Sequence, residues 1–150
     1  MITRRQLVGA WSLENYTETD VQSDEVSYPM GRHPEGLILY TSDGYMSAQL
    51  SLGGRDRFKS QDPYGASSEE YTAAGRSYIA YSGPFYFDES NGRLEHEMFV
   101  SFFPNWQGQR QVRIAAIDDD KLHLGPDRPM PFNGRLKTAS LIWKRALPNF

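Results

Sequence analysis

The chain of 150 residues contains no cysteine, so it can form no disulfide and offers no thiol for catalysis or metal binding. Its lysines and arginines are scattered, and no run of five or six basic residues occurs. The formal net charge is −3, which leaves a nucleic acid without the basic surface that such a partner requires. We therefore expect no nucleic-acid partner.

Long apolar segments are also missing from the sequence. Residues 1–7 lack the apolar core of a signal peptide, and no run is long enough to cross a bilayer as a helix. We therefore expect no membrane partner and a cytoplasmic location.

The common motifs of metal and cofactor sites are absent as well. The histidines His33, His96 and His123 show none of the spacings H-x-H, H-x-x-x-H or H-E-x-x-H. No serine lies in G-x-S-x-G, and neither G-x-G-x-x-G nor a Walker segment is present. We expect no metal and no cofactor.

Aromatic side chains, in contrast, are abundant: nine Tyr, eight Phe and three Trp make up 13% of the chain. Aromatic residues favour strands, and they also line small-molecule pockets. The length and the 39% hydrophobic content suit one domain with one core, spanning residues 1–150.

Short segments with alternating or aromatic-rich patterns recur along the chain, separated by turn formers such as Asp43-Gly44 and Asn91-Gly92. They predict strands over residues 9–20, 36–40, 45–50, 85–88, 93–103, 109–117, 121–125 and 135–145. Many antiparallel strands at short spacing favour a sandwich or a barrel. A barrel of about eight strands removes its edges and can hold one ligand.

One segment changes to a helical period. Residues 67–70, SSEE, have the form of a capping box. Tyr71, Ala74 and Tyr78 follow at helical spacing. This pattern predicts a single substantial helix over residues 68–81.

Motifs at the two ends of the chain indicate a family. The sequence GAW (9–11) opens the first strand after a short helical turn, and WKR (143–145) ends the last strand. Lipocalins begin with G-x-W and carry an Arg on a late strand that covers this Trp, because a guanidinium stacks on an indole. The longer segments EGLILYTSDGYMSAQL, YIAYSGPFYFD and FFPNWQGQRQVR, in this order and spacing, resemble the lipocalin-like domain family of small bacterial and fungal proteins.

The resemblance covers roughly residues 7–145 and implies an all-β fold. The expected architecture is a single antiparallel up-and-down β-barrel of the calycin type, with one α-helix near the barrel mouth. It also implies that Trp11 packs under Arg145 at the closed end of this barrel. We further expect the helix to border the entrance of the pocket.

The segment LEHEMFVSFFPNW (94–106) contains an unusual histidine. Read with period two, His96 shares an apolar face with Met98 and Val100, while Glu95 and Glu97 fall on the other face. In a barrel this apolar face would be the inner one, where His96 could act as a general acid or base or as a polar anchor for a ligand. An equally simple interpretation is a core histidine bonded to a neighbouring Tyr or backbone group.

The next strand presents Gln111 and Arg113 on one face and Val112 and Ile114 on the other. If the first face is inward, Arg113 lies close to His96 and could bind a carboxylate, an enolate or a carbonyl oxygen. The apolar character of positions 112 and 114 favours the opposite orientation, with Arg113 in solvent. The neighbourhood of His96 and the Q-V-R segment (111–113) of the family resemblance favour the inward orientation, so both orientations stay open.

Other candidates surround these two residues. Four tyrosines near the expected helix could present a phenol to a ligand while their rings pack, although plain packing is the simpler role for each. Asn15, in register with Trp11, is either a pocket amide or a satisfied core group. The candidate catalytic residues are His96, Arg113 and Tyr45, and the candidate ligand-binding residues are Asn15, Tyr78, Tyr81, Tyr86, Met98, Val100, Gln111 and Trp106.

The expected partner is a small apolar organic molecule. Some lipocalin-like barrels of natural-product pathways are similar to pericyclases, cyclases or isomerases, so the resemblance favours a cofactor-independent cyclase or isomerase. The alternative is a carrier or sequestering protein that transforms nothing. A cluster of His, Arg and Tyr around one void would favour the enzyme, and a uniformly apolar void would favour the carrier.

Overall fold

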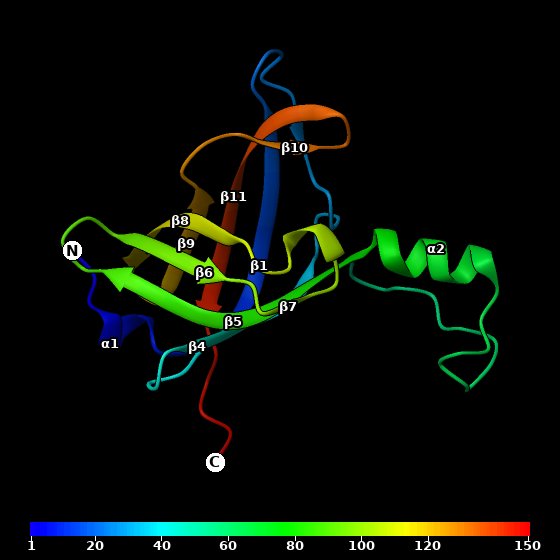
Figure 1. Cartoon of the computed structure of the whole chain (residues 1–150), viewed down its shortest axis with the longest axis horizontal. Helices are drawn as coiled ribbons and strands as arrows, with labels where there is room; N and C mark the ends of the chain where they lie inside the picture. Colours follow the sequence, from blue (N-terminus) through cyan, green and yellow to red (C-terminus); the bar gives the residue numbers. More distant parts are fainter.

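The computed structural model describes residues 1–150 as an eight-stranded antiparallel β-barrel (Figure 1). Its strands are β1 (Gly9–Asp20), β3 (Glu35–Tyr40), β4 (Tyr45–Ser51), β5 (Tyr78–Asp88), β6 (Arg93–Glu97), β8 (Arg110–Asp118), β9 (Lys121–Pro126) and β11 (Arg135–Arg145). Each pairs with the next in this order, and β11 pairs with β1 to close the ring. The predicted fold class is confirmed.

The other elements are short except for one helix. The strands β2 (Val26–Ser27), β7 (Val100–Ser101) and β10 (Met130–Phe132) pair with β1, β5 and β11 respectively. The helical elements are α1 (Arg4–Leu7), α2 (Ser68–Arg76) and the 3₁₀ turn η1 (Pro104–Trp106). None of the helices is long and apolar enough to cross a membrane.

The barrel core follows from the alternation of the strands. On β5, Tyr81 and Phe85 are buried while the neighbouring Tyr86 is exposed. A single cluster of 18 buried hydrophobic residues fills the interior and includes both Trp11 and Trp143. Part of the aromatic excess of the sequence is therefore used inside the barrel, while residues such as Tyr86 lie on its surface.

One end of the barrel is sealed as the G-x-W motif predicts. The Trp11 indole is completely buried, and its Nε1 donates to the Leu7 carbonyl at 2.9 Å. The Arg145 guanidinium lies 3.6 Å from the centre of this indole and donates to the Val8 carbonyl at 2.9 Å. Gly9 has a φ of +128°, and a Cβ there would lie 2.6 Å from Nη1 of Arg145. Both facts explain the glycine of the motif, and the predicted Trp11–Arg145 contact is confirmed.

The helix α2 has the predicted capping box, in which Ser67 Oγ accepts from the Glu70 amide at 3.2 Å and Glu70 Oε1 accepts from the Ser67 amide at 3.0 Å. The helix ends at Arg76, earlier than predicted, because Tyr78 already pairs with Ser51 of β4. It extends away from the barrel in Figure 1, none of its residues is buried, and none lines the interior pocket. The helix leads into β5 beside the open end, but it does not cover the entrance.

Candidate functional site

A small interior pocket lies at the end of the barrel opposite Trp11. Its volume is about 50 Å³, and 9 of its 11 lining residues are hydrophobic. Tyr16 of β1, Tyr81 of β5 and Leu141 of β11 form part of its wall, and Arg113 of β8 is the one charged residue among the lining side chains. The barrel therefore offers an apolar site with one cationic group.

The mouth of this pocket is built from short elements. Met130 and Phe132 come from β10, which pairs with β11 alone, and Trp106 comes from η1. The Trp106 ring packs edge-on against Tyr81, with centroids 6.1 Å apart. A three-residue strand and a 3₁₀ turn have few anchoring hydrogen bonds, so these side chains form the part of the wall best able to move.

Arg113 points into the barrel. The apolar residues at positions 112 and 114 had favoured the opposite orientation, with Arg113 in solvent. Across the β6–β8 pair, Leu94 lies opposite Arg113 and His96 lies opposite Gln111. Residues directly opposite each other in an antiparallel pair share a face. Because Leu94 and His96 are fully buried, Gln111 and Arg113 must face inward, and Ile114 is exposed.

The Arg113 guanidinium is held by two hydrogen bonds. Its Nη2 donates to Oε1 of Gln111 at 2.8 Å, and its Nη1 donates to the Val112 carbonyl at 3.1 Å. Gln111 is itself buried and donates from Nε2 to Gln109. The guanidinium therefore has a defined position in the pocket wall.

His96 is completely buried, on the inner face where the alternation predicted it. Its Nε2 and the Tyr40 hydroxyl share a hydrogen bond of 2.8 Å, whereas its Nδ1 has no partner. Burial, and secondly the positive charge of Arg113, lowers the pKa of His96 well below 6.5. The ring is therefore a neutral imidazole near pH 7.

His96 is separated from the pocket by one ring. Tyr81 lines the pocket and also packs against His96, with ring centroids 5.7 Å apart. His96 itself is not among the lining residues, so its imidazole does not contact the pocket directly. Met98, completely buried, likewise lies in the core rather than in the pocket wall.

A buried polar chain that the alternation missed lies on β1 and β11. The Tyr16 hydroxyl donates to Oε2 of Glu18 at 2.8 Å, and Nζ of Lys137 lies 3.6 Å from Oε1 of the same carboxylate. All three residues are buried. Burial, together with the negative charge of Glu18, raises the pKa of Tyr16 far above its usual value. Tyr16 is therefore a neutral donor to Glu18.

A β-bulge in β1 explains why the alternation did not predict this buried polar group and why it placed Asn15 inward. The register between β1 and β11 shifts between Leu13 and Asn15. Before the bulge Trp11 and Leu13 point inward, and after it Tyr16 and Glu18 do. Asn15 is only partly buried and does not line the pocket, so its inward placement was wrong. Nothing in the local sequence marks the extra residue.

Two tyrosines of the predicted set lie on the outer surface. Tyr45 is 52% exposed, because its neighbour Met46 takes the inward position on β4. Tyr86 is also exposed and donates to Oε2 of Glu97 at 2.7 Å. Neither Tyr45 nor Tyr86 therefore lies at the interior pocket.

Val100 is 59% exposed, so its predicted place on the inner face was also wrong. The predicted strand over 93–103 is interrupted after Glu97, and Val100 pairs instead with Ser82 of β5. Gly83 permits this approach, since a Cβ there would lie 1.9 Å from the Glu97 carbonyl oxygen. The interruption changes which side chains face inward.

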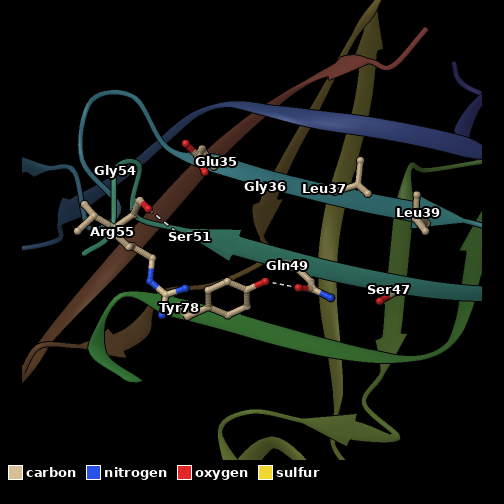
Figure 2. Close-up of a pocket in the computed structure, with 11 residues that line it drawn as sticks. Glu35, Gly36, Leu37, Leu39, Ser47, Gln49, Ser51, Gly54, Arg55 and Tyr78 are labelled. Atoms are coloured by element: carbon tan, nitrogen blue, oxygen red, sulfur yellow. Dashed lines mark hydrogen bonds between the residues drawn. The ribbon is translucent and has the colours of Figure 1, made fainter. Parts of the chain in front are cut away.

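Tyr78 belongs to a larger groove on the outer face of β3, β4 and β5. Figure 2 shows Leu37, Gln49 and Tyr78 along this groove, with Arg55 reaching over the Tyr78 ring. The groove has a volume of about 620 Å³, but it is open to solvent. Two of its polar side chains are already engaged: Tyr78 bonds to Gln49, and Arg55 donates to Ser77 at 3.1 Å. Because the groove is open, it encloses a ligand less than the interior pocket does.

The structure thus brings Tyr81, Trp106 and Arg113 together around the interior pocket, with Gln111 supporting Arg113 and His96 behind Tyr81. The catalytic and binding roles of these residues remain predictions. The structure contains no group of three or more His, Asp or Glu side chains that could hold a metal ion.

Comparison with known proteins agrees with the barrel fold. The sequence is 33% identical over 106 residues to the 4'-hydroxy-3'-methoxypropiophenone carrier protein ppsC of Aspergillus oryzae, a match that covers 67% of this chain and 96% of that protein. The family model described as a lipocalin-like domain matches residues 8–146. With nearly the whole barrel included in this match, the chain belongs to the lipocalin-like domain family.

Proposed function

We propose that the protein binds a small, flat, largely apolar organic molecule in the interior pocket and carries or sequesters it unchanged. The observation that supports this most directly is the apolar, aromatic lining of the one open end of an otherwise filled barrel. Concave apolar sites with a few placed polar groups are typical of small-molecule binding. The candidate catalytic residue His96 lies behind the pocket wall, which favours binding over chemistry.

The related protein supports the same class of ligand. Its name describes a carrier of an aromatic ring that bears hydroxyl, methoxy and propanoyl groups. Here the rings of Tyr81 and Trp106 could contact the faces and edges of such a ligand. We therefore propose a small aromatic molecule of secondary metabolism as the cargo.

The present volume requires the mouth to open before such a ligand can enter. An engineered cavity of about 150 Å³ holds one benzene molecule, whereas this pocket measures about 50 Å³. Displacing Met130 and Phe132 of β10, which is paired on one side only, would enlarge the site without breaking the eight-stranded ring.

Filling the pocket should weaken the binding of a ligand. We expect Ala139→Phe, inside the pocket, to weaken the binding of the neutral fluorescent probe N-phenyl-1-naphthylamine by tenfold or more, which corresponds to about 1.4 kcal/mol. The matched control is Ala116→Phe, on the outer face of β8, which should bind within about twofold of wild type. A fluorescence titration measures both variants, after circular dichroism confirms their fold. Equal affinities would place the probe outside the barrel.

A second candidate function is a cofactor-independent isomerase or cyclase, favoured by the unpartnered Nδ1 of neutral His96 beside Arg113. With Tyr81 displaced, the imidazole could donate or accept a proton, and Arg113 could stabilise negative charge that develops on a substrate oxygen. Tyr40 would then orient the imidazole through its 2.8 Å hydrogen bond.

The two functions differ in what happens to the bound molecule. A molecule that co-purifies with the protein can be identified by mass spectrometry and incubated with fresh protein. The carrier returns it unchanged. An isomerase or cyclase yields a product of the same mass and a different retention time, and His96→Gln should slow that conversion by roughly a hundredfold or more.

A further inference from the structure

The charges that face the barrel interior do not balance. Glu18 is compensated by Lys137, 3.6 Å away, and Asp20 is compensated by Arg135, 3.1 Å away. None of the nine ion pairs in the structure includes Arg113. The pocket wall therefore carries one positive charge without a counter-ion.

The hydrogen bonds of Arg113 do not supply the missing charge. Its two acceptors, the Gln111 side-chain oxygen and the Val112 carbonyl, are both neutral. A guanidinium has five N–H donors, so three remain for another partner. Because Gln111 is buried and holds Nη2 at 2.8 Å, this donor array is in place before any ligand arrives.

Two further ionisable groups around the pocket, Tyr16 and His96, are neutral. Tyr16 donates its proton to Glu18, and its raised pKa keeps it a phenol. His96 is an imidazole whose pKa is lowered by burial and by Arg113 itself. The remaining wall is mainly apolar. Arg113 is partly buried, so its charge has limited access to water and gains from the approach of an opposite charge.

We propose that the cargo binds as an anion with delocalised charge, an acidic phenol or an enolised dicarbonyl compound, with its oxygen on Arg113. This inference rests on the proposed function, since it uses the same pocket. The flat part of the anion would pack among Tyr81, Trp106 and Leu141. A delocalised phenolate or enolate suits this wall better than a carboxylate, whose concentrated charge loses more hydration energy on burial.

The test compares two probes of similar shape. At pH 8.5, 4-nitrophenol is an anion, whereas 4-nitroanisole, its methyl ether, is neutral. We expect the wild-type protein to bind the phenolate at least tenfold more tightly in an equilibrium dialysis experiment. Arg113→Met should remove this preference, so that the two probes bind within about threefold of each other. Arg110→Met, on the exposed face of the same strand, is the matched control and should retain the preference.

The outcomes separate this inference from the proposed function. Equal binding of both probes by wild type, or a preference that survives in Arg113→Met, overturns the anion proposal and leaves the pocket proposal standing. Failure of wild type to bind either probe overturns both. If Arg113→Met does not fold, the ratio of the two wild-type affinities still tests the anion proposal.

Discussion

Replacing Glu18 by Ala should lower the free energy of unfolding by about 3–5 kcal/mol. The carboxylate is only 2% exposed and lies between the Tyr16 hydroxyl at 2.8 Å and Nζ of Lys137 at 3.6 Å. Its removal leaves a buried ammonium without a counter-ion and a buried phenol without its acceptor. Both groups lose their partner at once, and water has little access to this part of the barrel to replace it. Chemical denaturation measures the difference.

A second ion pair of the same barrel provides the control. Lys121 and Glu14 lie closer together, at 2.8 Å, but their side chains are 45% and 41% exposed. Glu14→Ala should change the stability little, because water already solvates both charges and salt screens them. If the two variants lost equal stability, burial would not decide the strength of an ion pair in this barrel.

Replacing both buried charges should recover much of that stability. In a double variant, Glu18→Leu with Lys137→Met, no unpaired charge remains, and the new side chains fill similar volumes. Part of the loss should persist, since the Tyr16 hydroxyl still lacks its acceptor. A double variant as unstable as Glu18→Ala would contradict the desolvation argument.

The barrel and its closed end could be predicted because the sequence features that specify them are either local to one strand or part of the motifs shared with the family. Alternation in segments such as 45–50 is imposed by the pleat, and the observed β4 keeps it. The pairing of Trp11 with Arg145 follows from two short motifs at the chain ends, and it fixes the strands that close the ring.

The inward face of β8 could not be read from that strand alone. Its own apolar residues, Val112 and Ile114, favoured the wrong face. The register of β6 against β8, which sets His96 opposite Gln111, decides the orientation. Register is a property of two strands together, so the information lies in a pair of segments rather than in either one.

The errors at Asn15 and Val100 have the same physical origin. Each follows an interruption of a strand, the bulge after Leu13 and the break after Glu97, and the inward alternation of the preceding residues no longer holds at these two positions. The helix α2 was predicted too long for another reason: the Tyr78 backbone gains a partner in β4, and tertiary pairing prevails over the local helical pattern.

We expect wild type to lose stability on mild acidification, and replacing His96 by Gln should remove this loss. Burial lowers the pKa of His96 in the folded state well below 6.5, whereas the unfolded chain takes up the proton near 6.5. Below that pH the unfolded state binds one more proton than the native state. The free energy of unfolding should therefore fall by about 1.4 kcal/mol for each pH unit, until the folded-state pKa is reached.

The informative window is about pH 6.5 to 5, where wild type should lose stability and His96→Gln should remain nearly flat. The pKa values of Asp20 and Glu70 are lowered by backbone hydrogen bonds, so these carboxylates contribute below that window. His33→Gln, at an exposed loop position, is the matched control and should keep the wild-type slope. Denaturant titrations at several pH values give the slopes. An unchanged slope in His96→Gln would mean that the buried imidazole takes up its proton in the folded barrel. The isomerase candidate depends on a neutral imidazole behind Tyr81, so that candidate would then have to be abandoned.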